Sequence, residues 1–263
     1  MDLLQALILG IIQGLTEFLP VSSSGHLEIG KVLLGVHIEE SLSFSVAVHG
    51  ATVLSTVVVF RNDIVSILKG FFQFKWNTET RFVLMIFLSL IPVAIVGFFF
   101  EQRVESLFTG NLLLVGSMLL ITAALLTLSM VVKQRKEKPI GFADSLIIGI
   151  AQALAVIPGI SRSGATIASG LILGNNRTEV ARFSFLMVLI PILGANFLDI
   201  VKGNFSSEAG AGIGAIIIGS IAAFVFGYLA CRWMISLVKK GKLMWFAVYC
   251  SIVGIISILS VIL

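Results

Sequence analysis

Long apolar runs dominate the chain and alternate with short polar segments. A membrane-spanning helix needs about 20 mainly apolar residues. Six runs meet this length: 41–60, 81–100, 111–132, 181–201, 212–238 and 243–263. We therefore predict a transmembrane helix in each run, and an all-α polytopic membrane protein as the fold class.

Two further apolar regions, 2–36 and 142–174, are each interrupted by a polar loop rich in serine and glycine. Broken helices at membrane depth are tolerated where they are buried in protein or line an aqueous cavity. We predict that both regions form re-entrant helical hairpins. Two tilted spans in each region are the alternative.

The two interrupted regions repeat each other. At a shift of 139 residues, 10–45 and 149–184 align without a gap and are identical at 12 of 36 positions, which indicates an internal duplication. We predict a single membrane domain over 1–263 with two repeats, 1–132 and 140–263. An odd number of predicted spans separates the hairpins, so the second repeat should be inverted and the two serine loops should meet inside the membrane.

Composition and charge support a membrane location. Hydrophobic residues make up 57% of the chain and charged residues 12%, about half the usual charged share. In the predicted topology 14 of the 18 Lys and Arg residues lie on one side, which should be cytoplasmic, so both termini should lie outside. No basic stripe with interleaved aromatic residues indicates nucleic-acid binding. Cys231 and Cys250 lie in apolar runs and are expected to be buried packing residues.

The first hairpin carries a carboxylate in an apolar setting. Gln13 and Glu17 are four residues apart and therefore share a helix face. The second hairpin keeps the glutamine as Gln152 but has Val156 in place of the glutamate. An ionisable residue inside a membrane is a functional candidate by default. Because the repeat does not preserve it, Glu17 is better explained by chemistry than by helix packing.

The segment "PGISRSGAT", residues 158–166, has the composition of an anion site. The planar guanidinium of Arg162 suits a phosphate group, and a helix N-terminus near Gly164 would add a positive dipole end. The predicted phosphate-binding residues are Ser22, Ser24 and Gly25 from the first loop and Ser161, Ser163, Gly164 and Thr166 from the second.

A nucleophile and a base are expected in "SSSGH", residues 22–26. Ser23 is the favoured nucleophile because the repeat aligns it with Arg162, whereas the serines on either side recur. His26 would take its proton, since serine needs a base. Attack by water activated by His26, and attack by His26 itself, remain alternatives. His49 is expected to be a packing or hydrogen-bonding residue and His37 a solvated one.

The stretches "GIIQGLTEFLPVSSSGH" and "GIAQALAVIPGISRSGAT" resemble the undecaprenyl-diphosphate phosphatases of the bacitracin-resistance type. The resemblance covers essentially the whole chain. It implies a hydrolase of the bacterial cell (inner) membrane that removes the terminal phosphate of the polyprenyl diphosphate lipid on the outer face. The carrier would thereby be recycled for peptidoglycan synthesis, with bacitracin resistance as a result.

The same resemblance implies site residues and a cofactor. Glu17, Ser23, His26 and Arg162 would be catalytic, and a divalent cation, Mg²⁺ or Ca²⁺, would be bound by Glu17 with Gln13, directly or through water. Gln13 stands where some relatives carry a carboxylate. Weak metal binding without substrate is therefore expected.

Two other functions are alternatives to a diphosphate phosphatase. Type 2 phosphatidic-acid phosphatases need a histidine after their Ser-Arg element, and no histidine follows Arg162, which excludes them. A transporter or flippase for a phosphorylated polyprenyl lipid is the main alternative, because inverted repeats with broken helices are typical of transporters. A homodimer is left open.

Overall fold

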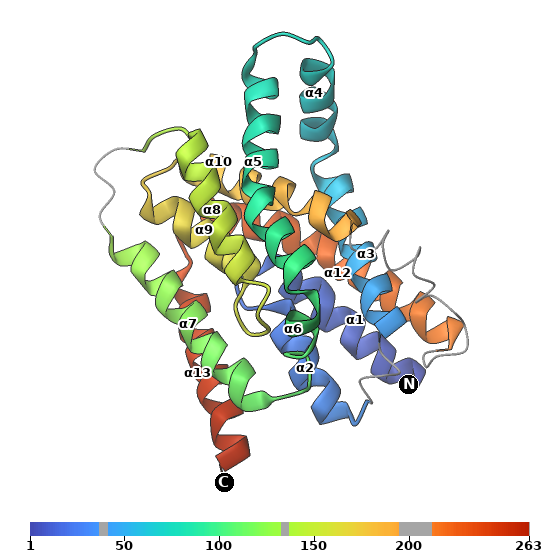
Figure 1. Ribbon diagram of the computed structural model, residues 1–263. Coiled ribbons are helices and arrows are strands. Elements are labelled where there is room, and N and C mark those ends of the chain that lie inside the picture. The colour runs from blue at the N-terminus through green and yellow to red at the C-terminus, as the bar shows by residue number, and fades with distance from the viewer. Residues whose placement is uncertain (37–41, 133–136, 195–211, 263) are drawn as a thin grey trace.

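The computed structural model describes residues 1–36, 42–132, 137–194 and 212–262, which form an assembly of helices (Figure 1). In chain order the α-helices are α1 (Leu3–Phe18), α2 (Ser23–Leu34), α3 (Leu42–Val59), α4 (Arg61–Phe71), α5 (Thr78–Phe99), α6 (Glu101–Glu105), α7 (Leu112–Val131), α8 (Phe142–Leu154), α9 (Arg162–Ile172), α10 (Arg177–Met187), α12 (Ile213–Lys239) and α13 (Met244–Ile262). The all-α polytopic class predicted from the apolar runs is confirmed.

Within the described ranges, four helices are long and apolar enough to cross a membrane: α5, α7, α12 and α13. They confirm the spans predicted at 81–100, 111–132, 212–238 and 243–263. The run 41–60 forms α3, which passes the same test only together with α4, and the pair is bent by 75°. In the run 181–201, α10 already ends at Met187, and residues 195–201 lie outside the described part of the chain.

Both interrupted regions form a helix, a polar loop and a second helix, as expected. The first helices, α1 and α8, have 16 and 13 residues and are therefore short for a span. The second helices begin with equivalent caps: Ser22 Oγ accepts the N–H of Gly25 at 3.2 Å, and Ser161 Oγ accepts that of Gly164 at 3.0 Å. Serine at these positions satisfies an amide that the helix itself leaves unpaired.

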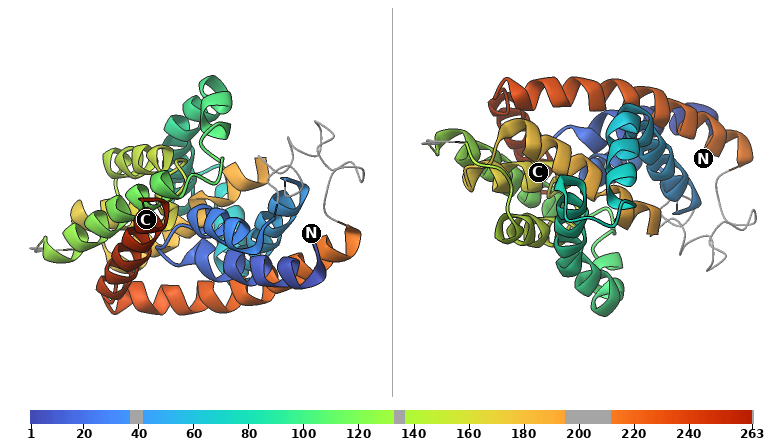
Figure 2. Two further views of the ribbon diagram at one scale, coloured as in Figure 1. Left: turned by 90° about the horizontal axis from the view of Figure 1, so that it is seen from below. Right: turned by 90° about the horizontal axis from the view of Figure 1, so that it is seen from above.

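The hairpin helices pack against helices from the other half of the sequence. α1 lies along α12, and α8 lies along α5. Figure 2 shows α12 running along one edge of the molecule with α1 beside it in both views. α7 packs against α13, where Gly116 and Gly254 face each other. The proposed boundaries of the two repeats stay a prediction.

Many large apolar side chains point outward from the long helices. On α5, for example, Phe87, Ile91 and Ile95 are about half exposed, while only Met85, Ile86 and Ser89 of this helix are buried. A helix whose large apolar residues face away from the protein is typical of contact with lipid rather than with water. This outward-facing apolar surface is what the low share of charged residues predicted.

The two ends of the chain lie toward the same end of the molecule. In Figure 1 the N- and C-termini are both near the bottom, and the hairpin of α4 and α5 projects at the opposite end. A common side for the termini was expected from the sequence. Loop 133–136 and His37, which also entered the predicted topology, lie outside the described residues.

We expect the close helix contacts to depend on glycine at two positions. A Cβ at Gly10 would overlap the backbone of Gly219, and one at Gly149 would overlap the backbone of Ser89, whereas a Cβ at Gly97 meets nothing within 4 Å. Gly10→Ala and Gly149→Ala should each destabilise the protein by about 1–3 kcal/mol. The matched control Gly97→Ala should be neutral or stabilising, since alanine favours helix. Thermal unfolding in detergent measures this, and equal melting temperatures for all three variants would contradict it.

Candidate active site

A pocket of about 240 Å³ lies where the loops of the two hairpins meet. The loops touch directly: Gly159 N–H donates to Ser22 Oγ at 3.1 Å, and Ser163 Oγ donates to the carbonyl of Leu19 at 3.1 Å. A Cβ at Gly25 would lie only 3.1 Å from the Cα of Gly159, so the backbones approach closely. The expected meeting of the two serine loops is thus observed.

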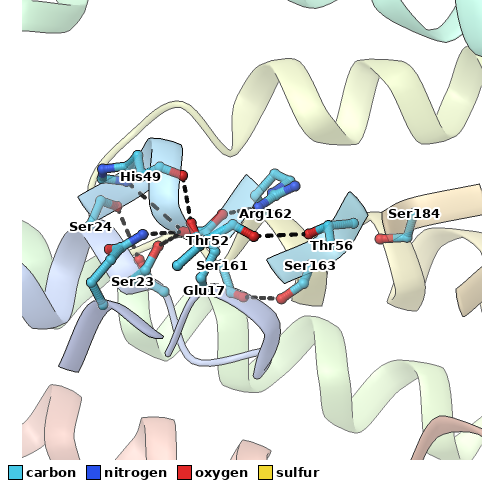
Figure 3. Close-up of polar contacts among 12 residues, drawn as sticks. Glu17, Ser23, Ser24, His49, Thr52, Thr56, Ser161, Arg162, Ser163 and Ser184 are labelled. Carbon is cyan, nitrogen blue, oxygen red and sulfur yellow. Dashed lines mark hydrogen bonds and ion pairs between the residues drawn. The ribbon is translucent and has the colours of Figure 1, made fainter. Parts of the chain in front are cut away.

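An ion pair joins the hairpins at this pocket. Glu17 near the end of α1 accepts a hydrogen bond from Arg162 at the start of α9. Figure 3 shows the two side chains together with Ser23. The same carboxylate accepts from Ser23 Oγ at 2.7 Å and from Gln13 Nε2 at 2.9 Å. The sequence prediction brought Gln13, Glu17, Ser23 and Arg162 together correctly.

Hydroxyl groups and helix N-termini line the rest of the polar wall. Ser22, Ser24, Ser161 and Ser163 all line the pocket. Ser22 and Ser24 lie 3.3 Å apart between their oxygens, and the equivalent pair Ser161 and Ser163 shows the same spacing. Both α2 and α9 begin here, and the first amides of a helix favour an anion. The pocket therefore combines an arginine, hydroxyl donors and two helix N-termini.

His26 does not lie in this pocket. Its Nδ1 is 2.8 Å from the carbonyl of Ser22, its Nε2 is 2.8 Å from the hydroxyl of Tyr249, and its ring stacks on that tyrosine. The predicted reach toward Glu17 and Arg162 is therefore not observed, because the side chain leaves α2 on the face that packs toward α13. In this geometry His26 connects the Ser22 end of the loop to Tyr249 on α13 and does not face the pocket.

Three predicted phosphate-binding residues lie behind the pocket wall. Thr166 is fully buried, and its hydroxyl contacts the carbonyl of Arg162 at 2.9 Å and the hydroxyl of Ser184 at 2.6 Å. The amides of Gly25 and Gly164 are bonded to the capping serines, and neither glycine lines the pocket. These residues shape the loops instead of facing a ligand.

The sequence predicted His49 as a packing or hydrogen-bonding residue and did not place it in the site. The imidazole lines the pocket, with Nε2 3.9 Å from Glu17 Oε2. Its Nδ1 lies 2.8 Å from the carbonyl of Ser45, and a carbonyl can only accept, so Nδ1 carries the hydrogen. The available signal was a histidine one turn inside an apolar span. Nothing in the sequence showed which face of α3 would turn toward Glu17.

The family model "Bacitracin resistance protein BacA" matches residues 6–256, which include both hairpins and the pocket. The chain belongs to this family.

Relatives with curated names are similar to the chain over almost its full length. A protein of Bacteroides fragilis is 55% identical over 261 residues, covering 98% of each chain, and is named undecaprenyl-diphosphatase. Proteins of Parabacteroides distasonis, at 54% identity and 98% coverage of each chain, and of Methanosphaera stadtmanae, at 41% identity and full coverage of both, carry the same name.

The pocket of this BacA-family protein offers only part of the ligand set that a divalent cation requires. Within the described residues, no three His, Cys, Asp or Glu side chains form a cluster suited to a metal. Glu17 is the carboxylate that lines the pocket. Gln13 donates to this carboxylate through Nε2 but does not itself line the pocket, and its Oε1 is buried without a hydrogen-bond partner. Oxygen donors of this kind suit Mg²⁺ or Ca²⁺, provided that other ligands come from substrate phosphates and water.

We expect the Glu17–Arg162 pair to stabilise the fold as a unit. Glu17→Gln or Arg162→Gln alone leaves a buried charge unpaired and should reduce the free energy of unfolding by about 3–5 kcal/mol. The double variant should recover much of this loss. The control is Asp63→Asn, which removes the more exposed pair with Arg182 and should change stability by about 1 kcal/mol or less. Thermal unfolding in detergent measures all four, and additive losses in the double variant would contradict the coupling.

Proposed function

We propose that the chain hydrolyses undecaprenyl diphosphate to undecaprenyl phosphate and inorganic phosphate. The observation that carries this proposal is the convergence of Arg162 and Ser23 on Glu17 in one pocket. It supplies a phosphate-binding cation, a hydroxyl nucleophile and a base within hydrogen-bond reach of each other. The name shared by the relatives supports the same substrate.

Positioning and charge stabilisation are the main tasks of a protein in phosphoryl transfer. Arg162 would hold the non-bridging oxygens of the diphosphate through its planar fork, as guanidinium groups do with phosphate. The hydroxyls of Ser24 and Ser161 and the N-termini of α2 and α9 add further donors on the same wall, whereas the Ser163 hydroxyl already donates to the carbonyl of Leu19. For Arg162 to bind phosphate, part of its contact with Glu17 must be exchanged for the substrate.

Glu17 replaces His26 as the proposed base. The hydroxyl of Ser23 already donates to Glu17 Oε2, so the carboxylate is placed to take its proton. Ser23 Oγ then forms a bond to the terminal phosphorus, the bond from this phosphorus to the bridging oxygen breaks, and undecaprenyl phosphate leaves. In the second step water adds to the phosphorus, the bond to Ser23 Oγ breaks, and Ser23 Oγ takes up the proton held by Glu17. Both hydrogens of the water leave with inorganic phosphate.

A divalent cation belongs to the proposal. Gln13 Oε1 and Glu17 would hold Mg²⁺ or Ca²⁺ together with phosphate oxygens of the substrate. When bound, the cation would neutralise part of the diphosphate charge. Since the described residues offer few protein ligands, binding without substrate should be weak.

The orientation in the membrane is a further part of the proposal. The uneven distribution of Lys and Arg supports a cytoplasmic position for the loop 61–80. Both termini, which lie at the opposite end of the molecule in Figure 1, would then be outside. Hydrolysis would occur on the outer face and return the lipid carrier to peptidoglycan synthesis.

We expect purified protein to release phosphate from undecaprenyl diphosphate, and we expect Arg162→Lys to lose most of this activity. Lysine keeps the charge but cannot bind phosphate through a planar fork, so kcat/KM should fall about 100-fold or more. Phosphate release in detergent measures this. Lipid movement across vesicles without phosphate release by wild type would favour a flippase, and near-normal hydrolysis by the lysine variant would remove Arg162 from the phosphate site.

We expect a phosphoserine intermediate at Ser23. Acid quenching of a reaction with radiolabelled terminal phosphate should leave label on the protein, and peptide mapping should place it at Ser23. Ser23→Ala should abolish the label and most of the turnover, while the control Ser117→Ala, on the exposed part of α7, should change neither. Label on His26 would overturn the assignment. Turnover retained by Ser23→Ala without any label would favour direct attack by water.

A further inference from the structure

Gln152 is a buried amide that the proposed mechanism does not use. It lies on α8, is 4% exposed and lines the pocket. Neither its Oε1 nor its Nε2 has a hydrogen-bond partner among the described residues. Most buried polar side-chain atoms in proteins have at least one partner. An amide with both ends unpaired at the wall of a pocket therefore needs an explanation.

The neighbouring helix explains why the protein itself offers no partner. Gly149 brings α8 against the backbone of Ser89 on α5. About one turn further along each helix, Gln152 and Val93 line the same pocket. The next turn of the chain after Gln152 contributes Val156, which also lines it. The amide is therefore placed between apolar side chains and the pocket.

The internal repeat shows what the amide is adapted to hold. Gln152 corresponds to Gln13 at the shift of 139 residues. Gln13 Nε2 donates to an oxygen of Glu17 at 2.9 Å, one turn later in α1. The position that corresponds to Glu17 is Val156, so the second repeat keeps the amide donor but has lost its anionic acceptor. The local setting is otherwise similar, because both glutamines precede a loop that ends in an equivalent serine cap.

We infer that Gln152 binds the substrate by donating from Nε2 to a non-bridging oxygen of the diphosphate. The phosphate oxygen takes the place that a Glu17 oxygen has beside Gln13. Arg162 and Ser161 line the same pocket and would contact the same anion. The amide Oε1 then accepts from water or a hydroxyl group in the pocket, because it cannot bind phosphate oxygen. This inference rests on the proposed function, since it assigns a role toward the same substrate.

The test is Gln152→Met, which keeps the length of the side chain but removes both polar atoms. We expect kcat/KM for undecaprenyl diphosphate to fall about 10- to 100-fold, mainly through a higher KM, because a hydrogen bond to a charged group is lost. The melting temperature should stay the same or rise, because no protein partner loses its bond. The control is Ser145→Ala on the same helix, whose hydroxyl bonds the carbonyl of Phe142 away from the pocket and whose loss should leave KM unchanged.

A purely structural role would give a different result. A lower melting temperature with unchanged KM, or kcat/KM within twofold of wild type, would overturn the inference while wild-type hydrolysis still supported the proposed function. If Gln152→Met does not fold, Gln152→Glu keeps the shape of the side chain but replaces the amide donor by a carboxylate, which places a negative charge beside the diphosphate. It should then raise the inhibition constant of inorganic pyrophosphate at least about tenfold, and an unchanged constant would overturn the inference.

A wild-type protein that releases no phosphate would contradict the proposed function separately. The inference would then be decided by binding alone, through the rise in melting temperature that inorganic pyrophosphate gives to wild type. Loss of that rise in Gln152→Met, with the rise retained in Ser145→Ala, would support an anion contact at Gln152. An equal rise in wild type and Gln152→Met would overturn it.

Discussion

The contact between Glu17 and Arg162 is the interaction on which the candidate site depends. The two residues are 145 positions apart in the sequence, and they come from hairpins whose first helices pack against different helices, α12 and α5. Their contact requires the two loops to approach at backbone distance, which the glycines at 25 and 159 allow. A single buried ion pair thus ties the chemistry to the arrangement of the whole chain, because neither hairpin alone holds both charges.

The broad architecture was predictable because lipid imposes a simple rule on sequence. Runs of about 20 apolar residues gave the four long helices, and interrupted runs gave the two hairpins. The predicted span 41–60 ends where α3 ends, but the helix α4 that follows it at a bend of 75° was not predicted. No proline or glycine marks the bend at Phe60.

Part of the candidate site was predictable because the chain contains two versions of one motif, which can be compared position by position. Glu17, Ser23 and Arg162 stand out because their counterparts differ, and they are the residues that meet. The contacts of His26 and His49 were not predicted, because their neighbours in sequence do not determine which face of a helix turns toward the pocket. His26 faces Tyr249 on α13, whereas His49 faces Glu17 from α3, and both contacts join residues distant in the chain. Thr166 was misplaced for the same reason, since its partner Ser184 belongs to another helix.

The contact between Gly116 and Gly254 bears on the origin of the protein. These glycines occupy nearly equivalent positions in the two repeats, and a Cβ on either one would lie under 3 Å from the carbonyl oxygen of the other. The predicted duplication implies an ancestor of half the present length, in which the equivalent contact would join two copies of the same chain. Two such copies would carry the same residues in both loops. A single chain is free of this constraint, because each of its loops can carry its own residues, as Ser23 and Arg162 do at aligned positions.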